Sequence, residues 1–376
     1  MISAVERAHL AALAGFDHMT TQRLLSLCSG RSPVEAYAMA SGAAPPSPPI
    51  AAGFRRFPEL ASRWRASAQT VTPDDAAARC ESLGVRIVVP GDPEWPPQLL
   101  DDPRRPAVLF MQGDAGALGR RRVGIVGTRN PTRRGAQIAA RFGDELAAAG
   151  VCVVSGLALG VDGAAHRGAL AAASAAPAAV VANGHGAPYP RRHRALWEQV
   201  AEAGVILSEW PPGTAPEPFR FPQRNRILAA VSELVIVVES RERGGSLITA
   251  REAAERGIDV FAVPGPIDQR SCVGTNSLLE DGATPVASTE TILVALGLDN
   301  RRAGRRRFDA RPRPVGDESV ALDLCRGEPQ HVESVARSER WDLARAAMAL
   351  ARLERAGWVA ESGGWFERVD EYGDLV

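Results

Sequence analysis

Lysine is absent from this 376-residue sequence, so all 44 of its basic side chains are arginines. The absence excludes a lysine Schiff base, the lysine of a P-loop and the nucleotide-binding lysine of a kinase. Strong nucleotide bias in the genome is enough to explain it. The 44 acidic residues balance the arginines, and the formal net charge is zero.

Cysteines and long apolar runs are also scarce. The five cysteines lie far apart, with no C-x-x-C pair, at positions 28, 80, 152, 272 and 325. This spacing predicts neither a zinc site nor a disulfide framework and fits a reducing cytoplasm. No signal-type segment opens the chain, and alanine, serine, glycine and proline dominate the uncharged stretch 168–190. We therefore expect a cytoplasmic protein without a membrane span.

The balanced total charge hides an uneven distribution. Residues 121–226 hold 13 arginines and 7 acidic residues, net +6, whereas residues 317–376 hold 7 and 13, net −6. A basic half-domain suggests a polyanionic partner, although ordinary charge segregation is the alternative. The length alone favours two or three domains.

One strand–helix–strand unit lies at residues 122–162. Residues 123–126 are an apolar run that ends at a glycine, and residues 151–154 are a second such run. Short apolar runs bounded by glycine predict buried parallel strands. Between them, Thr132 can cap a helix whose apolar residues recur every four positions. These features predict a βαβ unit of the Rossmann type.

The first loop of this unit, Gly127-Thr128-Arg129, is a candidate phosphate site. Glycine lets backbone N–H groups approach a ligand, a helix N-terminus adds a positive field, and the arginine supplies a fork of donors. The alternative is a tight turn with a solvated arginine. A dinucleotide is disfavoured, because G-x-G-x-x-G is missing and the second strand ends in Ser155 where an acid would hold the ribose.

Apolar runs predict six further strands, most of them separated by helical segments. They are expected at residues 85–89, 108–111, 178–182, 205–208, 234–239 and 260–264. The alternation predicts an extended, Rossmann-like α/β core with a mostly parallel sheet. Loops rich in glycine and arginine follow the strands and would line one anion-binding trough at their carboxyl ends.

The segment Phe221–Arg226 carries the most specific local signal on these loops. Arg224 and Arg226 lie two apart at a helix start, so one can meet phosphate while the other braces the site. Phe221 can stack on a base, and core packing is the alternative.

Few residues suit catalysis. Asp162 and His166 can form an acid–base pair, but we favour an N-cap with a hydrogen-bonded histidine. Ser155 and Ser246 lack a G-x-S-x-G setting, and His185 has no nearby thiol or second histidine for a metal. We therefore predict no catalytic residue, no metal and no cofactor.

Two acidic residues end strands at the predicted trough. Glu209 and Glu239 can serve a nucleotide hydrolase, or they can instead orient Arg226 or Arg129.

The segment before the core divides in two. Residues 1–40 predict a small helical module of three helices, in which Ser32-Pro33-Val34-Glu35 is a good helix start. Docking on the core is favoured over DNA binding as a helix-hairpin-helix. Residues 41–84 are predicted to form a proline-rich linker and a connecting segment. We expect residues 41–53 of this linker to be flexible or to adopt a polyproline conformation.

The core is predicted to span residues 85–298, and two segments follow it. Residues 299–316 form a basic linker, expected to be disordered, which either tethers the tail or attracts DNA nonspecifically. Residues 317–376 resemble a winged helix, whose net charge of −6 favours a protein-contact or regulatory role over duplex DNA binding.

Ten motifs in one order resemble the DNA-processing protein A, or Smf, family over about residues 85–290. They read GTR, SGLALGVDGAAHRGAL, YP, SEWPPG, FPQRNRILAAVS, VVES, GGSLITA, VFAVPGPID, GTN and GA. The resemblance implies a non-enzymatic core that binds and protects single-stranded DNA. It also implies that the protein helps to load the RecA recombinase, notably in natural transformation, and dimerises through the core.

By the same resemblance, the residues of the trough become the DNA site. They are Gly127, Thr128, Arg129, Ser155, Gly156, Phe221, Arg224, Asn225, Arg226, Gly245, Ser246 and Gly265.

The chain departs from the family pattern at four positions in or beside these loops. Thr128 replaces a serine and keeps the hydroxyl, and Gly245 replaces another serine. Leu159 and Pro218 stand where basic residues are common, and each removes an expected phosphate contact.

Two rival functions remain open at this point. A phosphoribohydrolase acting on nucleoside monophosphates shares a Rossmann-like core but has a P-G-G-x-G-T loop, and Pro264-Gly265-Pro266 counts against it. A scaffold in which the acidic winged helix does the main work is the other rival.

Overall fold

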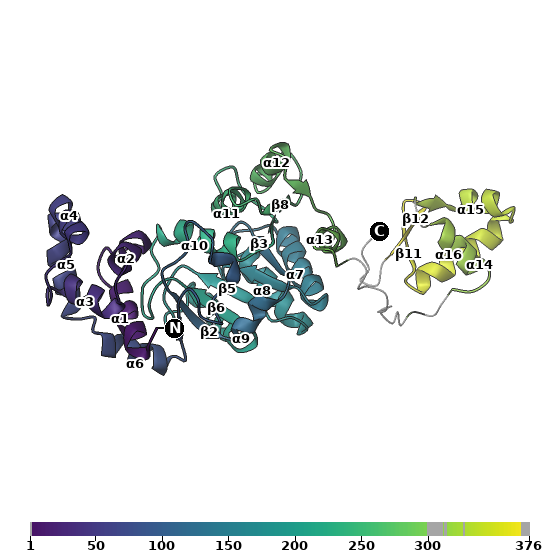
Figure 1. The fold of residues 1–376 in the computed structure, drawn as a ribbon. Coiled ribbons are helices and arrows are strands. Elements are labelled where there is room, and N and C mark those ends of the chain that lie inside the picture. Colours follow the sequence, from purple (N-terminus) through teal and green to yellow (C-terminus); the bar gives the residue numbers. More distant parts are fainter. Residues whose placement is uncertain (1, 299–310, 312–313, 326–327, 370–376) are drawn as a thin grey trace. The chain divides into compact units, whose positions relative to one another are not determined.

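The computed structural model describes residues 2–298, 311, 314–325 and 328–369 (Figure 1). The chain divides into two compact units, Met1–Arg302 and Ala303–Val376. Most of the predicted basic linker, 299–316, lies outside the described residues. Within those residues, no helix combines the length and the hydrophobicity needed to span a bilayer.

Six helices precede the sheet in the first unit. They are α1 (Ala4–Ala14), α2 (Thr21–Cys28), α3 (Pro33–Ser41), α4 (Pro48–Arg56), α5 (Pro58–Ala68) and α6 (Pro73–Ser82). The three helices predicted before residue 41 are present, and Ser32 forms the expected capping box with Glu35. Leu13 and Trp64 share one apolar cluster with Phe110 of the sheet, so these helices dock on the core.

The flexible linker predicted over residues 41–53 is wrong in its second half, where α4 begins. Prolines are tolerated there because they occupy the first helical positions, whose N–H groups need no intrahelical partner. Ile50 is buried in the cluster of the docked helices, and that burial favours a helix over an extended segment.

Nine strands form one mixed sheet in the order β1-β2-β6-β5-β4-β3-β7-β8-β9. β2 pairs antiparallel with β1 and β6, and all other pairs are parallel. The mostly parallel α/β prediction is confirmed. The strands are β1 (Arg86–Val88), β2 (Leu109–Gly113), β3 (Arg122–Val126), β4 (Cys152–Ser155), β5 (Ala178–Val181), β6 (Val205–Ser208), β7 (Leu234–Val237), β8 (Asp259–Ala262) and β9 (Thr284–Pro285).

The helices that connect the strands cover both faces of the sheet. α7 (Arg133–Ala148), α8 (Val161–Ala172) and α9 (Arg194–Ala203) carry the chain from β3 to β6 along one face, and α7 and α8 lie side by side (Figure 1). α10 (Arg220–Ala230) and α11 (Gly245–Ala254) cover the other face. Strands β4, β5 and β6 follow one another on one side of β3, and β7 and β8 follow on its other side. The strand order therefore changes direction between β3 and β7, and open α/β sheets commonly bind ligands at such a point.

Shorter elements complete this unit. They are the 3-10 helices η1 (Pro97–Leu99), η2 (Ala115–Gly119) and η3 (Arg191–His193), and the helices α12 (Val273–Glu280) and α13 (Thr289–Ala295).

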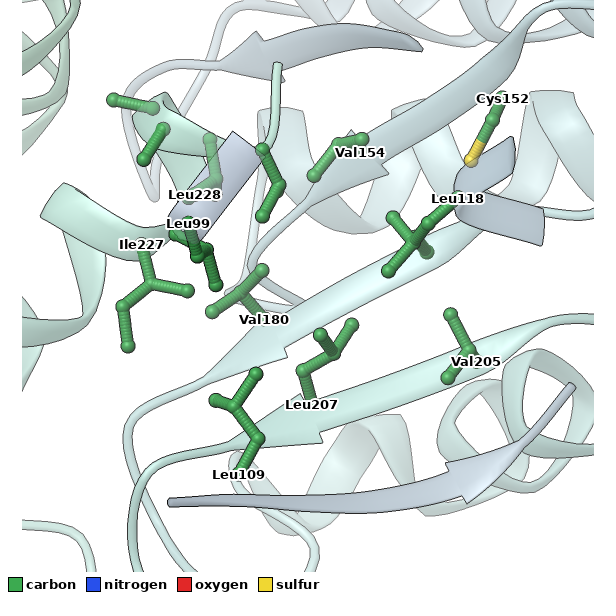
Figure 2. Close-up of a cluster of buried hydrophobic side chains, with 14 of the residues drawn as sticks. Leu99, Leu109, Leu118, Cys152, Val154, Val180, Val205, Leu207, Ile227 and Leu228 are labelled. Atoms are coloured by element: carbon green, nitrogen blue, oxygen red, sulfur yellow. The ribbon is translucent and has the colours of Figure 1, made fainter. Parts of the chain in front are cut away.

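The alternation of side chains along the strands divides the core into two layers. Val154, Val180 and Leu207 point toward α10, where they pack with Ile227 and Leu228 (Figure 2). On the opposite face, apolar residues of β3 pack against Phe142 and Leu146 of α7. Because both of their faces are buried, the central strands β4, β5, β6 and β7 are almost entirely apolar instead of alternating, as their sequences predicted.

In its described residues, the second unit combines three helices with a small antiparallel sheet of order β10-β12-β11. This composition confirms the winged-helix prediction. Its elements are α14 (Asp317–Leu324), β10 (Gln330–His331), α15 (Val332–Glu339), α16 (Leu343–Arg355), β11 (Val359–Ser362) and β12 (Trp365–Arg368).

Two buried histidines make the stability of the first unit depend on pH. His166 of α8 is fully buried, and neither ring nitrogen has a hydrogen-bond partner among the described residues. Burial lowers the pKa of His166 to about 3 and that of His185 to about 4. Their stabilising effect is complete above the unfolded pKa of about 6.5 and is lost as the pH falls toward the folded values.

Between about pH 6 and pH 5, unfolding of this unit should therefore take up about two protons. Urea titrations at several pH values measure this uptake as the slope of the unfolding free energy against pH. His166→Gln should reduce the uptake by about one proton. A wild-type slope near zero in this window would contradict neutral burial of the two rings.

Candidate nucleic-acid interface

A pocket opens at the carboxyl edge of the sheet, where the loops after β3, β4 and β5 meet the first turn of α10. Three of the predicted site residues, Arg129, Gly156 and Phe221, line it. The remaining lining residues are Ala158, Leu159, Ala182, Asn183, Tyr189 and Pro190. The pocket therefore draws on three loops and one helix that are far apart in the sequence.

An arginine and two aromatic rings dominate this pocket. The guanidinium carbon of Arg129 lies 4.5 Å from the ring centroid of Phe221. The Tyr189 ring lies 5.8 Å from Phe221 at an interplanar angle of 54°, and Tyr189 is 39% exposed. Arg129 is exposed and Phe221 half-buried. Flat apolar surface beside a guanidinium suits a ligand that joins a planar ring to a negative charge.

Arg224 lies beneath the pocket and does not line it. Its side chain is buried, and Nη2 donates to the carbonyl of Gly156 at 3.4 Å. A Cβ on residue 156 would lie 1.8 Å from Nη1, so only glycine allows this approach. The expectation that Arg224 meets phosphate directly is not supported, because the guanidinium is covered by the loop that it holds.

The charge on Arg224 has an internal counterpart in Asp162. Burial lowers the pKa of Arg224, and the charge of Asp162 opposes that shift. Burial likewise raises the pKa of Asp162, and the charge of Arg224 opposes it in turn. Asp162 therefore interacts with Arg224 inside the protein and does not face a ligand.

Arg226 braces the site, as the sequence predicted for one arginine of this pair. Its Nη2 atom donates to both carboxylate oxygens of Glu209, at 2.5 and 2.6 Å. The hydroxyl of Thr21 in α2 donates to the same carboxylate at 2.5 Å. The interpretation that Glu209 orients Arg226 is confirmed. The sequence did not reveal Thr21, which ties the N-terminal helices to α10.

The start of α7 already holds an anion, and that anion is Glu239. Thr132 donates to the Glu239 carboxylate from its backbone N–H at 2.9 Å and from its hydroxyl at 2.5 Å. The N–H of Thr128 donates to the Glu239 carbonyl at 2.7 Å. Glu239 therefore occupies part of the helix start at which a phosphate was predicted, and it shapes the loop instead of orienting Arg129.

Both predicted serines use their hydroxyls inside the protein. Ser155 is fully buried and donates to the carbonyl of Ile125 at 2.6 Å. The hydroxyl of Ser246 is buried and donates to Ser240 Oγ at 2.9 Å. Neither hydroxyl is presented to a ligand, because each satisfies a polar group that the fold has buried.

The remaining predicted residues hold loops together outside the pocket. Asn225 is buried and donates from Nδ2 to the Gly245 carbonyl at 3.2 Å, which joins the middle of α10 to the start of α11. Gly265 exchanges two hydrogen bonds with the side chain of Asn276, at 3.2 and 3.0 Å.

The favoured prediction for Asp162 and His166, an N-cap with a hydrogen-bonded histidine, is wrong, and the alternative acid–base pair is not formed either. Gly160 occupies the N-cap position, so Asp162 lies inside the helix, and His166 makes no hydrogen bond to it. His185 has its Nε2 2.9 Å from the Phe110 carbonyl. No metal-ligand cluster exists among the residues that the structure describes.

Sequence reasoning missed Tyr189, Pro190 and Asn183 as site residues. Tyr189-Pro190 was visible as one of the ordered motifs, but nothing in the sequence placed it opposite Phe221. Asn183 is buried and donates to the carbonyls of Gly184 and Ala187, which fixes the loop that carries the tyrosine.

Gly156→Ala should destabilise the first unit, because the added methyl group must displace the Arg224 guanidinium. We expect a loss of about 1–3 kcal/mol, seen as a melting temperature several degrees lower by circular dichroism. Gly119→Ala is the matched control, since a Cβ there meets nothing within 4 Å. Equal melting temperatures for the two variants would disprove the close contact.

Comparison with known proteins agrees with this architecture. The family model for DNA recombination-mediator protein A matches residues 86–297. DNA processing protein DprA of Bacillus subtilis is 42% identical over 205 residues, which cover 54% of this chain and 68% of that protein. The X-ray structure of DNA processing protein A from Streptococcus pneumoniae superposes with a TM-score of 0.63 at 28% identity, over 78% of this chain and 98% of that one.

A second solved structure concerns the binding of single-stranded DNA by DNA processing protein A from Helicobacter pylori. It matches with a TM-score of 0.51 at 29% identity, over 57% of this chain and 96% of that one. The matched residues include every loop that lines the pocket. The chain therefore belongs to the DNA recombination-mediator protein A family, the DprA or Smf family that its ordered motifs resemble.

Proposed function

We propose that this protein binds single-stranded DNA at the pocket between Arg129 and Tyr189, and that it acts as a carrier of the strand and not as an enzyme. Family membership supports the proposal, and so does the relative from Helicobacter pylori, whose structure concerns single-stranded DNA. In this role the protein protects incoming DNA and presents it for recombination, including natural transformation.

The observation that carries the proposal is the cluster of Arg129, Phe221 and Tyr189 at the pocket. A base stacked on an aromatic ring gains about 1–3 kcal/mol whatever its identity, because every base has a π face. Arg129 has no carboxylate partner among the described residues and can pair with the adjoining phosphate. A paired, stacked base cannot enter such a pocket, so the arrangement favours single strands over duplex.

The buried carboxylates argue against the rival phosphoribohydrolase. Glu239 occupies the start of α7, where a nucleotide phosphate would otherwise bind. Glu209 is neutralised by Arg226, and Asp162 is buried within α8. None of these three is presented to the pocket as a general acid or base.

The partners that we propose follow from the family. A RecA-type recombinase would receive the strand, and a homodimer formed through the core would present two pockets on one DNA. Recombination of chromosomal DNA implies a cytoplasmic site of action. The acidic winged helix suits a protein contact or a regulatory role better than duplex binding.

Arg129→Gln should weaken binding of oligothymidylate and flatten its salt dependence, because one phosphate contact is lost. The slope of log affinity against log salt should become less negative by about 0.7, with about fivefold weaker binding near 0.1 M salt. Fluorescence anisotropy at several salt concentrations measures both quantities.

Two further variants separate this effect from a general loss of charge or structure. Arg251→Gln removes an exposed arginine in the last turn of α11, outside the pocket, and should leave the slope unchanged. Arg224→Met should lower stability, since Arg224 is buried. If Arg129→Gln binds with the slope of the unaltered protein, the pocket is not the DNA site.

A further inference from the structure

An exposed aromatic ring lies at the corner between α4 and α5. Phe57 ends α4 and precedes α5, and its side chain is 38% exposed. The guanidinium carbons of Arg23 in α2 and Arg56 in α4 lie over this ring, 5.6 and 5.4 Å from its centroid. Arg55, next to them in the last turn of α4, is exposed as well. We refer to Phe57 with these three arginines as the arginine corner.

Packing and hydrogen bonding hold the arginine corner in place. Phe54 of α4 packs on Trp64 of α5 with ring centroids 5.6 Å apart, which holds the two helices together. Arg23 donates from Nη1 to the carbonyl of His18 at 2.6 Å. A guanidinium group is attracted to the face of an aromatic ring, so Phe57 gathers two arginines that come from different helices.

The charge of the arginine corner is not neutralised within the described part of the chain, where its three arginines form no ion pair. Arg63 of α5 differs, since it pairs with Asp17 at 2.7 Å. Residues 18–68 hold six arginines and only two acidic residues. Of these two, Glu35 closes the capping box of α3, and Glu59 lies in the first turn of α5, where the helix dipole favours an acid. The helices before the sheet therefore present net positive charge.

The arginine corner and the pocket belong to the same packed unit but are separate sites. None of the residues of the corner lines the pocket. The hydroxyl of Thr21 in α2 donates to Glu209, which also accepts from Arg226 of α10. Arg23 lies two residues after Thr21 on α2, and Phe221 of the pocket lies on α10. In Figure 1, α4 and α5 lie beyond α2 as seen from the sheet. The two sites are therefore fixed relative to each other.

The chemistry of the arginine corner suits a different nucleic acid from that of the pocket. Neighbouring arginines repel one another, and a polyanion relieves that repulsion. The pocket offers a base two neighbouring rings, whereas the corner offers one ring over which two guanidinium groups already lie. Contact through charge alone favours the ligand with the denser charge. Duplex DNA carries about one negative charge per 1.7 Å of its axis, against about one per 3.4 Å for each strand.

We propose that the arginine corner binds the phosphate backbone of duplex DNA, at a site separate from the pocket for the single strand. Its guanidinium groups pair with phosphates and do not read the base sequence. A protein with both sites holds an unpaired strand and a duplex together, which is the arrangement that joining a strand to a duplex requires. The inference goes beyond the proposed function, and each site can be tested without the other.

The test uses the full chain carrying Arg23→Gln and Arg56→Gln together, with fluorescence anisotropy at several salt concentrations. For a blunt duplex of about 20 base pairs, loss of two phosphate contacts should make the salt slope less negative by about 1.8, with about 60-fold weaker binding near 0.1 M salt. Binding of oligothymidylate should not change. Arg129→Gln should do the reverse, weakening the binding of oligothymidylate and leaving that of the duplex unchanged.

Two further variants control for the change in charge and for folding. Arg251 in the last turn of α11 and Arg270 before α12 are exposed, and neither side chain has an ion-pair partner in the described part of the chain. Arg251→Gln with Arg270→Gln should keep the duplex slope of the unaltered protein. Arg56→Gln alone leaves the bond from Arg23 to His18 in place and should change the duplex slope by about 0.9. It keeps the inference testable if the double variant unfolds.

Each remaining outcome separates the two sites. A duplex slope unchanged in the Arg23/Arg56 variant, or changed equally in the control, overturns the inference and leaves an acidic protein surface as the ligand of the corner. Equal weakening of duplex and oligothymidylate overturns it too, because the corner is then part of the single-strand site. If the unaltered protein binds oligothymidylate but not the duplex, the inference fails and the proposed function stands. If it binds only the duplex, the proposed function fails and the inference stands.

Discussion

The pocket depends on one buried contact, in which the Arg224 guanidinium packs against the backbone of Gly156. A charged side chain is costly to bury, and here the charge of Asp162 offsets part of that cost. The contact draws the loop after β4 onto α10. Because Phe221 lies on the same helix, the contact also sets the distance between Phe221 and the loop that faces it.

The other carboxylates of this edge are also used internally. Glu239 satisfies Thr132 at the start of α7, and Glu209 neutralises Arg226 beside α2. In the part of the chain that the structure describes, Arg129 has no carboxylate partner. The positive charge near the pocket therefore results from how the acidic residues are placed, although acidic and basic residues are equal in number.

The strands, and their alternation with helices, could be predicted because apolar runs and the glycines that bound them are local properties of the sequence. The capping box at Ser32 was predictable for the same reason. The roles of Arg224, Glu239 and Tyr189 were not, since each depends on a partner far away in the chain. Spacing shows that two arginines on one helix face different ways, but not that Gly156 covers one and Glu209 pairs with the other. The helix over Pro48–Arg56 was missed because its stability comes from the burial of Ile50 and not from its composition.

The central claim is that an unpaired DNA strand lies with a base in the pocket between Arg129 and Tyr189, in contact with Tyr189 and Phe221. Photocrosslinking of an oligothymidylate that carries 5-iodouracil, followed by mass spectrometry of the joined peptides, tests this claim directly in the full chain. The account predicts crosslinks at Tyr189 and Phe221, which an excess of unlabelled oligothymidylate abolishes. Crosslinks confined to the winged-helix unit or to the N-terminal helices would contradict it.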